Sequence, residues 1–135
     1  MVRNSQRVEK HKRRSKNASG HRTAVTPHCK IWMERNGRIA LSDWRVELLE
    51  LVGETGSLAA AAKRLHVPYR TAWYKLKELE ECWGVPLLVT ASGGVAGGGS
   101  WLTTEAQELI SRFRRISADI HQIVEKRYRE EFRDG

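Results

Sequence analysis

The chain has 135 residues, of which 30% are charged, and its formal net charge is +8. This length suits one domain built around one hydrophobic core. No apolar run approaches the roughly 18 residues of a membrane span, and the basic N-terminus lacks the apolar segment of a secretory signal, so we expect a cytoplasmic protein with no membrane partner. Cys29 and Cys82 have neither a zinc-ligand spacing nor the density of a disulfide scaffold, which predicts reduced thiols.

The positive charge is concentrated in residues 1–29. This tail holds eight Lys or Arg residues and one Glu, a net charge of +7, whereas residues 30–135 hold 16 basic and 15 acidic residues. With so few apolar residues to bury, the tail is predicted to be disordered. Two interpretations stay open. In one, the tail is a solubilising leader, or even upstream sequence if translation starts at Met33. In the other, it is an arm that binds phosphates without sequence preference.

The next elements are predicted to be a hairpin and an amphipathic helix. Ile31 and Met33 alternate with Trp32 and Glu34 over "KIWMER", and "RIAL" follows Asn36-Gly37, the strongest two-residue hairpin signal. A helix follows at once, because Ser42 can cap it and Asp43 favours its positive end. Its apolar positions have helical spacing: Trp44, Leu48, Leu51 and Val52. Two glycines bracket its end, Gly53 and Gly56.

Two further helices are predicted with a tight turn between them. The first begins at Ser57 and contains "LAAAAKRL", whose alanines allow another helix to approach closely. It ends after Leu65, because Pro68 disfavours a helical conformation at the preceding residue. The second helix runs from Tyr69 to about Trp83. Two helices joined in this way are typical of a helix-turn-helix, whose second helix enters the major groove.

The helix at 69–83 has distinct faces when projected at about 100° per residue. Its core stripe is Ala72, Leu76, Leu79 and Trp83. Its outward side is Arg70, Tyr74 and Lys77, with Thr71 and Lys75 on one flank. Residues 55–77 contain five basic side chains and no acidic one, whereas Glu78 and Glu81 follow, so the N-terminal half is the part expected to face nucleic acid. The alternative is an ordinary solvated basic face.

A glycine-rich loop follows this helix. "PLLVT" and "SWLT" predict two short strands, and the loop between them is expected to be a wing at residues 90–101 that lies beside the duplex. Glycines leave backbone N–H groups unscreened and permit positive φ, both useful for following phosphates. The alternative is a hairpin connection without contacts, since the loop has no Lys or Arg. No nucleotide-binding glycine motif is present.

The last segment, from Thr104 to about Arg133, is predicted to be one long helix. Thr104 and Gln107 fit a capping box. Its apolar seam has coiled-coil spacing: Leu109, Phe113, Ile116, Ile120 and Ile123. At 1.5 Å per residue the helix is about 42 Å long, which favours a second copy as its partner. A homodimer would set two recognition helices about 34 Å apart on an inverted repeat. The alternative is that the helix packs only on its own domain.

These motifs together resemble a known family. "GSLAAAAKRLHVPYRTAWYKLKELEECWGVPLL" is similar to the N-terminal DNA-binding segment of LysR-type regulators and molybdate-responsive ModE-type repressors, while "YRTAW" and "GGVAGGGSWLT" favour the ModE branch. The resemblance covers about residues 31–128. It implies a winged helix-turn-helix dimer that represses or activates transcription, with Tyr69, Arg70, Thr71 and Tyr74 near bases and phosphates.

Three departures from the family pattern matter. Pro68 stands where these families usually have a capping serine, and the wing lacks basic residues. The chain ends at Gly135 without the oxyanion-binding domains with which ModE-type regulators hold molybdate, so no molybdate site and no cofactor are assigned.

The resulting expectation is a mainly α fold with a small β component: a basic tail at 1–29, a winged helix-turn-helix at 30–103 and a dimerisation helix at 104–135. The predicted DNA contacts are Ser57, Lys63, Arg64, Tyr69, Arg70, Thr71, Tyr74, Lys75, Lys77, Gly97, Gly98 and Gly99. Arg70, Thr71 and Tyr74 are expected to read or position on the major groove, and the lysines and Arg64 to contact phosphates. No catalytic or metal constellation is recognised, so no enzyme is predicted.

Two other functions remain as alternatives to a sequence-specific regulator. One is a winged-helix module that holds a protein partner, such as a separately encoded effector sensor. The other is a nucleoid-associated protein that binds DNA without sequence preference through its tail.

Overall fold

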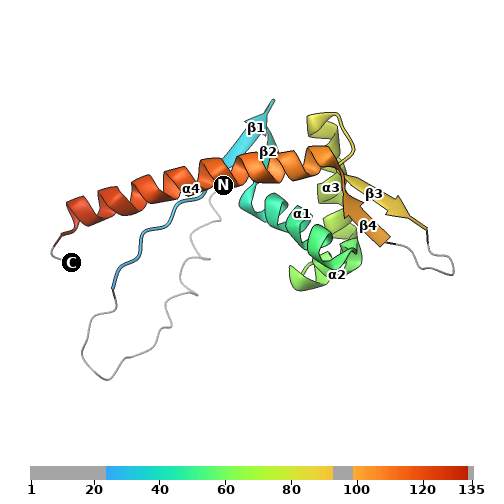
Figure 1. Cartoon of the computed structure of the whole chain (residues 1–135), viewed down its shortest axis with the longest axis horizontal. Helices are drawn as coiled ribbons and strands as arrows, with labels where there is room; N and C mark the ends of the chain where they lie inside the picture. Colours follow the sequence, from blue (N-terminus) through green and yellow to red (C-terminus); the bar gives the residue numbers. More distant parts are fainter. Residues whose placement is uncertain (1–23, 93–98, 134–135) are drawn as a thin grey trace, which may run out of the picture.

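The computed structural model describes residues 24–92 and 99–133. Its elements follow in the order β1 (Trp32–Arg35), β2 (Arg38–Ser42), α1 (Asp43–Thr55), α2 (Leu58–Arg64), α3 (Tyr69–Trp83), β3 (Leu88–Ala91), β4 (Gly99–Leu102) and α4 (Thr104–Glu131). The strands form two separate antiparallel pairs, β1–β2 and β3–β4. The fold is therefore mainly helical with a small β component, as the sequence predicts (Figure 1).

The hairpin β1–β2 forms around Asn36-Gly37, as expected. Both residues have positive φ, 52° and 77°, which is the conformation that a two-residue turn of this kind requires. The hairpin packs on the C-terminal end of α3, where Arg35 donates to the Cys82 carbonyl (2.7 Å) and the Trp83 indole donates to the Ala40 carbonyl (2.6 Å). These long-range bonds fix the hairpin against the end of α3 that carries its acidic residues.

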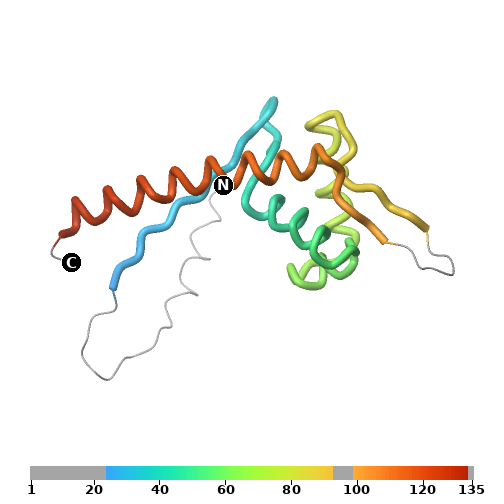
Figure 2. Tube along the Cα trace, viewed as in Figure 1, coloured from blue at the N-terminus to red at the C-terminus, as the bar shows by residue number. Residues whose placement is uncertain are grey.

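Helix α1 lies at the centre of the domain and contacts α2, α3, α4 and β4. The trace shows α4 crossing it (Figure 2). Gly53 allows the approach of β4, because a Cβ at this position would lie 2.9 Å from Leu102 Cδ1. The largest fully buried side chains come from these elements and from the segments that precede α1 and β3: Leu41, Val46, Leu48, Leu49, Val52, Leu79, Leu87 and Phe113.

Helix α1 starts at its predicted cap, Ser42, and Ser57, predicted to start the next helix, is the cap that precedes α2. The Ser42 hydroxyl accepts from Arg45 N and the Ser57 hydroxyl accepts from Ala60 N. Pro68 precedes α3 with extended backbone and makes no side-chain capping bond. The end of α1 lies at Gly56, which has φ 73° and donates its N–H to the Val52 carbonyl.

One predicted cap is wrong. The residue that caps α4 is Thr103, whose hydroxyl accepts from Ala106 N, and Thr104 is the first residue of the helix. Thr103 takes this role because the chain leaves β4 in an extended conformation, with φ −75° and ψ 168°, and its hydroxyl also donates to the Pro86 carbonyl. Among the helices that the structure describes, none combines the length and hydropathy needed to cross a membrane.

Candidate nucleic-acid interface

Small side chains hold α2 and α3 close together. Ala61, Ala62 and Ala72 are buried between the helices. The turn between them contains His66 at φ 58°, and Val67 N donates to the Ala62 carbonyl (3.1 Å), so the turn closes within a few residues. This arrangement presents the N-terminal half of α3 on the surface, as the helix-turn-helix prediction requires.

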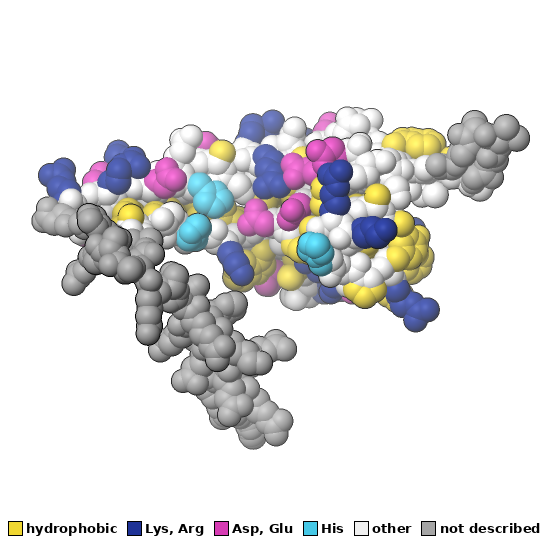
Figure 3. Space-filling model, turned by 90° about the horizontal axis from the view of Figure 1, so that it is seen from below, with side chains coloured by type: hydrophobic (Ala, Val, Ile, Leu, Met, Phe, Trp, Pro, Cys, Tyr) yellow, Lys and Arg dark blue, Asp and Glu magenta, His cyan; other side chains and the backbone are white. Residues whose placement is uncertain are grey.

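The exposed half of α3 is aromatic and basic. Tyr69 and Tyr74 are 53% and 55% exposed, Trp73 is 39% exposed, and Arg70 is also exposed. These four side chains line a shallow hollow of about 280 Å³. Thr71 is half-buried on the flank. On the globular part of the molecule, hydrophobic side chains lie beside Lys and Arg side chains (Figure 3).

The predicted cations differ in their intramolecular partners. Within the described residues, Arg70 and Lys63 make no ion pair. Two others are paired at the surface, Arg64 with Glu54 (3.2 Å) and Lys75 with Glu78 (4.0 Å). Lys77 pairs with Glu80 (3.2 Å), whose side chain is only 15% exposed. Exposed pairs contribute only about 0–1 kcal/mol, so exchanging one for a phosphate costs little. Arg70 and Lys63 need no such exchange.

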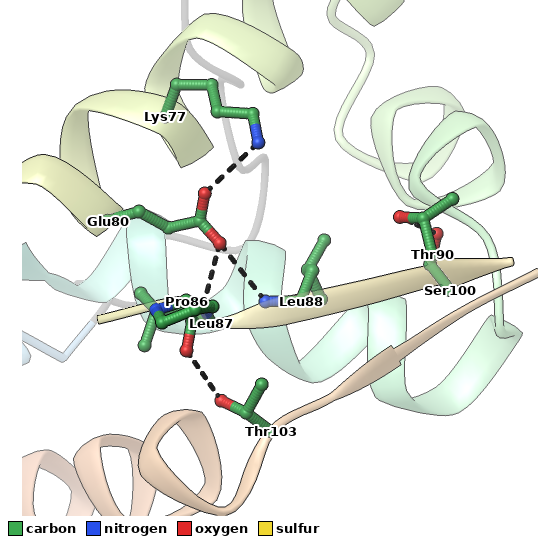
Figure 4. Close-up of polar contacts among 8 residues, drawn as sticks. All are labelled: Lys77, Glu80, Pro86, Leu87, Leu88, Thr90, Ser100 and Thr103. Atoms are coloured by element: carbon green, nitrogen blue, oxygen red, sulfur yellow. Dashed lines mark hydrogen bonds and ion pairs between the residues drawn. The ribbon is translucent and has the colours of Figure 1, made fainter.

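Glu80 connects α3 to the base of the wing, a role that its place in the sequence does not indicate. Its Oε2 atom accepts from Leu87 N (2.7 Å) and Leu88 N (3.3 Å), while Oε1 pairs with Lys77 (Figure 4). The Thr103 hydroxyl donates to the Pro86 carbonyl (2.9 Å) at the other end of the same segment. The carboxylate therefore fixes where β3 begins relative to the helix.

The described part of the wing consists of β3 and β4. Leu88 pairs with Leu102 and Ala91 pairs with Gly99, while the predicted contacts Gly97 and Gly98 lie outside the described residues. A Cβ on Gly99 would come within 3.2 Å of the Gly56 carbonyl oxygen, which accepts from Ser100 N (2.9 Å). Gly99 therefore has a packing role, and the N-terminal end of β4 is attached to the turn between α1 and α2.

The predicted contact Ser57 lies in that same turn. Its hydroxyl accepts from Ala60 N (3.1 Å) as the cap of α2, and its backbone N–H donates to the Thr55 hydroxyl (3.2 Å). The residue is half-buried. Its first role is therefore to order the start of α2, next to the N-terminal end of β4.

Two other arginines have structural roles: Arg45 is buried, and Arg114 lies at the surface between α4 and α1. Burial lowers the pKa of Arg45 from its usual value, an effect that the charge of Glu78 opposes. A hydrogen bond to Glu50 raises the pKa of Arg114, which also lies 3.7 Å from Asp43 and so ties α4 to α1. Neither guanidinium is placed to serve a ligand on the face of α3.

The five residues predicted for dimerisation fall into two groups. Leu109 and Phe113 are 9% and 0% exposed and lie in the core of their own domain. Ile116 and Ile123 are 43% and 64% exposed, and Ile120 is half-buried. The core contacts end at Ser117, although α4 continues to Glu131 and extends away from the domain (Figure 1). The first two apolar positions thus stabilise the monomer itself.

Metal-ligating side chains are scattered in the described part of the chain. No group of three or more His, Cys, Asp or Glu residues there is close enough to hold a metal ion. Cys29 and Cys82 are half-buried free thiols.

The family of bacterial regulatory helix-turn-helix proteins, lysR family, matches residues 45–107. Among curated relatives, the molybdenum-pterin-binding protein MopB of Rhodobacter capsulatus is 34% identical over 94 residues, which are 70% of this chain and 34% of MopB. The transcriptional regulator ModE of Haemophilus influenzae is 39% identical over 69 residues, 51% of this chain and 27% of that protein. The chain therefore spans about a third or less of these relatives.

A solved structure gives the same assignment. The DNA-binding domain of CbnR, in a crystal structure of its complex with DNA, is 30% identical and superposes with a TM-score of 0.51, covering 65% of this chain and 94% of that domain. The chain thus contains a winged helix-turn-helix DNA-binding domain of the LysR and ModE type.

Proposed function

We propose that this protein is a sequence-specific, dimeric transcription regulator that inserts α3 into the major groove of an inverted-repeat operator. The observation that carries the proposal is the exposed N-terminal half of α3, where Arg70 has no ion pair among the described residues. A guanidinium in this position can donate two hydrogen bonds to guanine O6 and N7. The likeness to a domain solved in a complex with DNA supports DNA as the ligand of this fold.

The residues around Arg70 divide by the chemistry available to them. Tyr69, Thr71 and Tyr74 border Arg70 and read or position on base edges. Lys63 contacts a phosphate directly, since it has no ion pair in the described residues, whereas Arg64 and Lys75 exchange their carboxylate partners for phosphates. Lys77 has three N–H donors and contacts a phosphate while it stays paired with Glu80. The wing lies along the phosphate backbone of the DNA through Gly97, Gly98 and Gly99. Ser57 orders the start of α2 beside the wing.

Dimerisation is proposed through the part of α4 beyond the core, within residues 104–135. Ile116 and Ile123 are exposed there, and an exposed seam of this kind is stabilised by a second copy. Residues 24–31 cover part of the same helix, because the Tyr128 hydroxyl donates to the Val25 carbonyl (2.9 Å). A two-fold dimer sets its recognition helices about 34 Å apart, one turn of DNA.

Selection of genomic fragments on the purified full-length protein at physiological salt tests this function. Enrichment of an inverted repeat with half-sites about one turn apart is the expected result. One relative is named as a molybdenum-pterin-binding protein, so the selection is run with and without molybdate. Retention of fragments without a shared motif would contradict the proposal.

The charge of the tail favours one second function, DNA binding without sequence preference. Residues 1–29 carry eight basic residues and one acidic residue. Deleting this tail distinguishes the two functions. For the proposed regulator the motif survives and the salt dependence of binding becomes shallower, whereas a tail-driven binder loses its affinity altogether.

A further inference from the structure

We infer that the hollow on α3 reads the C5 methyl group of a thymine in each half-site, an inference that rests on the proposed function and deepens it. The hollow is formed by two rows of side chains spaced by four residues on one helix face: Tyr69 with Trp73, and Arg70 with Tyr74. Three of these four side chains are aromatic and substantially exposed.

Two of the three aromatic side chains, Trp73 and Tyr74, are held in place by neighbouring groups. The Trp73 and Tyr74 rings meet edge to face, with centroids 5.3 Å apart and an interplanar angle of 80°. Lys77 Nζ lies 5.5 Å from the Trp73 ring centroid and is itself fixed by Glu80 at 3.2 Å. Both constraints come from α3 itself, so the hollow exists before any ligand is bound.

The composition of this surface selects its ligand. Exposed apolar clusters on soluble proteins mark interaction sites. On the face proposed to enter the major groove, the thymine C5 methyl is the one methyl group that the standard bases offer, and it is larger than the C–H groups of the other base edges. Arg70 at the rim supplies a guanine contact next to it. The half-site should therefore contain a thymine adjacent to a guanine.

The size of the effect follows from the group removed. Deoxyuridine lacks the methyl group and keeps the pairing edge and the O4 acceptor of thymine. Burial of one methylene-sized group changes affinity by about fourfold. Each thymine of the enriched operator is therefore replaced singly by deoxyuridine, and a loss of about fourfold is expected at one position in each half-site.

Protein variants assign that loss to the hollow. In Trp73→Ala and Tyr74→Ala the difference between thymine and uracil at that position should disappear, while Lys63→Ala should weaken all duplexes and keep the difference. Trp73→Phe serves as a conservative second variant, and circular dichroism checks that each variant folds. A methyl effect that persists in the aromatic variants, or equal affinity for thymine and uracil at every position of an enriched operator, would overturn the inference alone. Failure to enrich any operator would overturn the proposed function with it.

Discussion

Phe113 and Ile123 lie on the same helix and the same predicted seam. Substituting Phe113 should lower the stability of the monomer, whereas substituting Ile123 should weaken the dimer. Phe113 is fully buried in the domain core, and replacing it with Ala leaves a cavity that costs about 3–5 kcal/mol of unfolding free energy. A domain of this size has only about 5–15 kcal/mol in total, so the variant should be partly unfolded or melt much earlier. Phe113→Leu keeps most of the apolar volume and should lose less.

Ile123 is 64% exposed in the monomer, so Ile123→Ala should change the unfolding of dilute protein by less than about 0.5 kcal/mol. Full burial of such a side chain is worth about 1.5–3 kcal/mol. Covering its exposed part in a dimer thus gives roughly 1–2 kcal/mol per subunit and 2–4 kcal/mol per two-fold pair. The dimer dissociation constant should rise by a factor of about 30 or more.

Unfolding by urea at several protein concentrations, together with sedimentation velocity, separates the two effects. Phe113→Ala should lower stability equally at every concentration, and Ile123→Ala should act only where the wild type is dimeric. A concentration-independent loss for Ile123→Ala as large as that of Phe113→Ala would refute the division of α4 into a core part and a dimer part. A wild-type monomer at micromolar concentration would refute the dimer.

Three further outcomes are expected. Arg70→Ala should relax base preference at one position of the operator, by about 1–3 kcal/mol. Lys63→Ala should weaken binding to all duplexes alike and lower the slope of log affinity against log salt by about one. Equal losses on every sequence from both variants would contradict these roles. Glu80→Ala leaves two N–H groups at the wing base without an acceptor and should lower stability by about 1–3 kcal/mol, while Glu80→Gln retains an acceptor oxygen and should lose less in thermal unfolding. Thr103→Ala should cost about 1 kcal/mol as the cap of α4, and Thr104→Ala close to none, in the same assay.

Features that depend on neighbouring residues were predictable from the sequence. The turn at Asn36-Gly37, the cap Ser42 and the bounds of α3 at Tyr69 and Trp83 agree with the structure, and the helix predicted to start at Ser57 begins one residue later. Each rests on a backbone preference or a hydrogen bond that spans at most a few residues. The cap of α4 was missed because two threonines stand side by side and the path of β4 decides between them.

The candidate site could be located from the sequence but not resolved into roles. Charge clustering over residues 55–77 indicated the face of α3, yet it did not distinguish the unpaired Arg70 from Lys77, whose partner is Glu80. Gly99 was expected beside phosphates, and its approach to the Gly56 carbonyl depends on how the wing returns to α1. These properties require side chains from different elements to meet.

The sequence by itself determined the order of the helices, the hairpins and the exposed basic half of α3, because periodicity, caps and charge act over short distances along the chain. Only the tertiary structure decided that Phe113 belongs to the core and Ile123 to the surface, since both satisfy the same helical repeat. It also decided that Glu80 anchors the wing and that Tyr69, Trp73 and Tyr74 enclose a hollow with Arg70. The physical reason is that burial and pairing depend on which elements pack together, and that packing is a property of the whole domain.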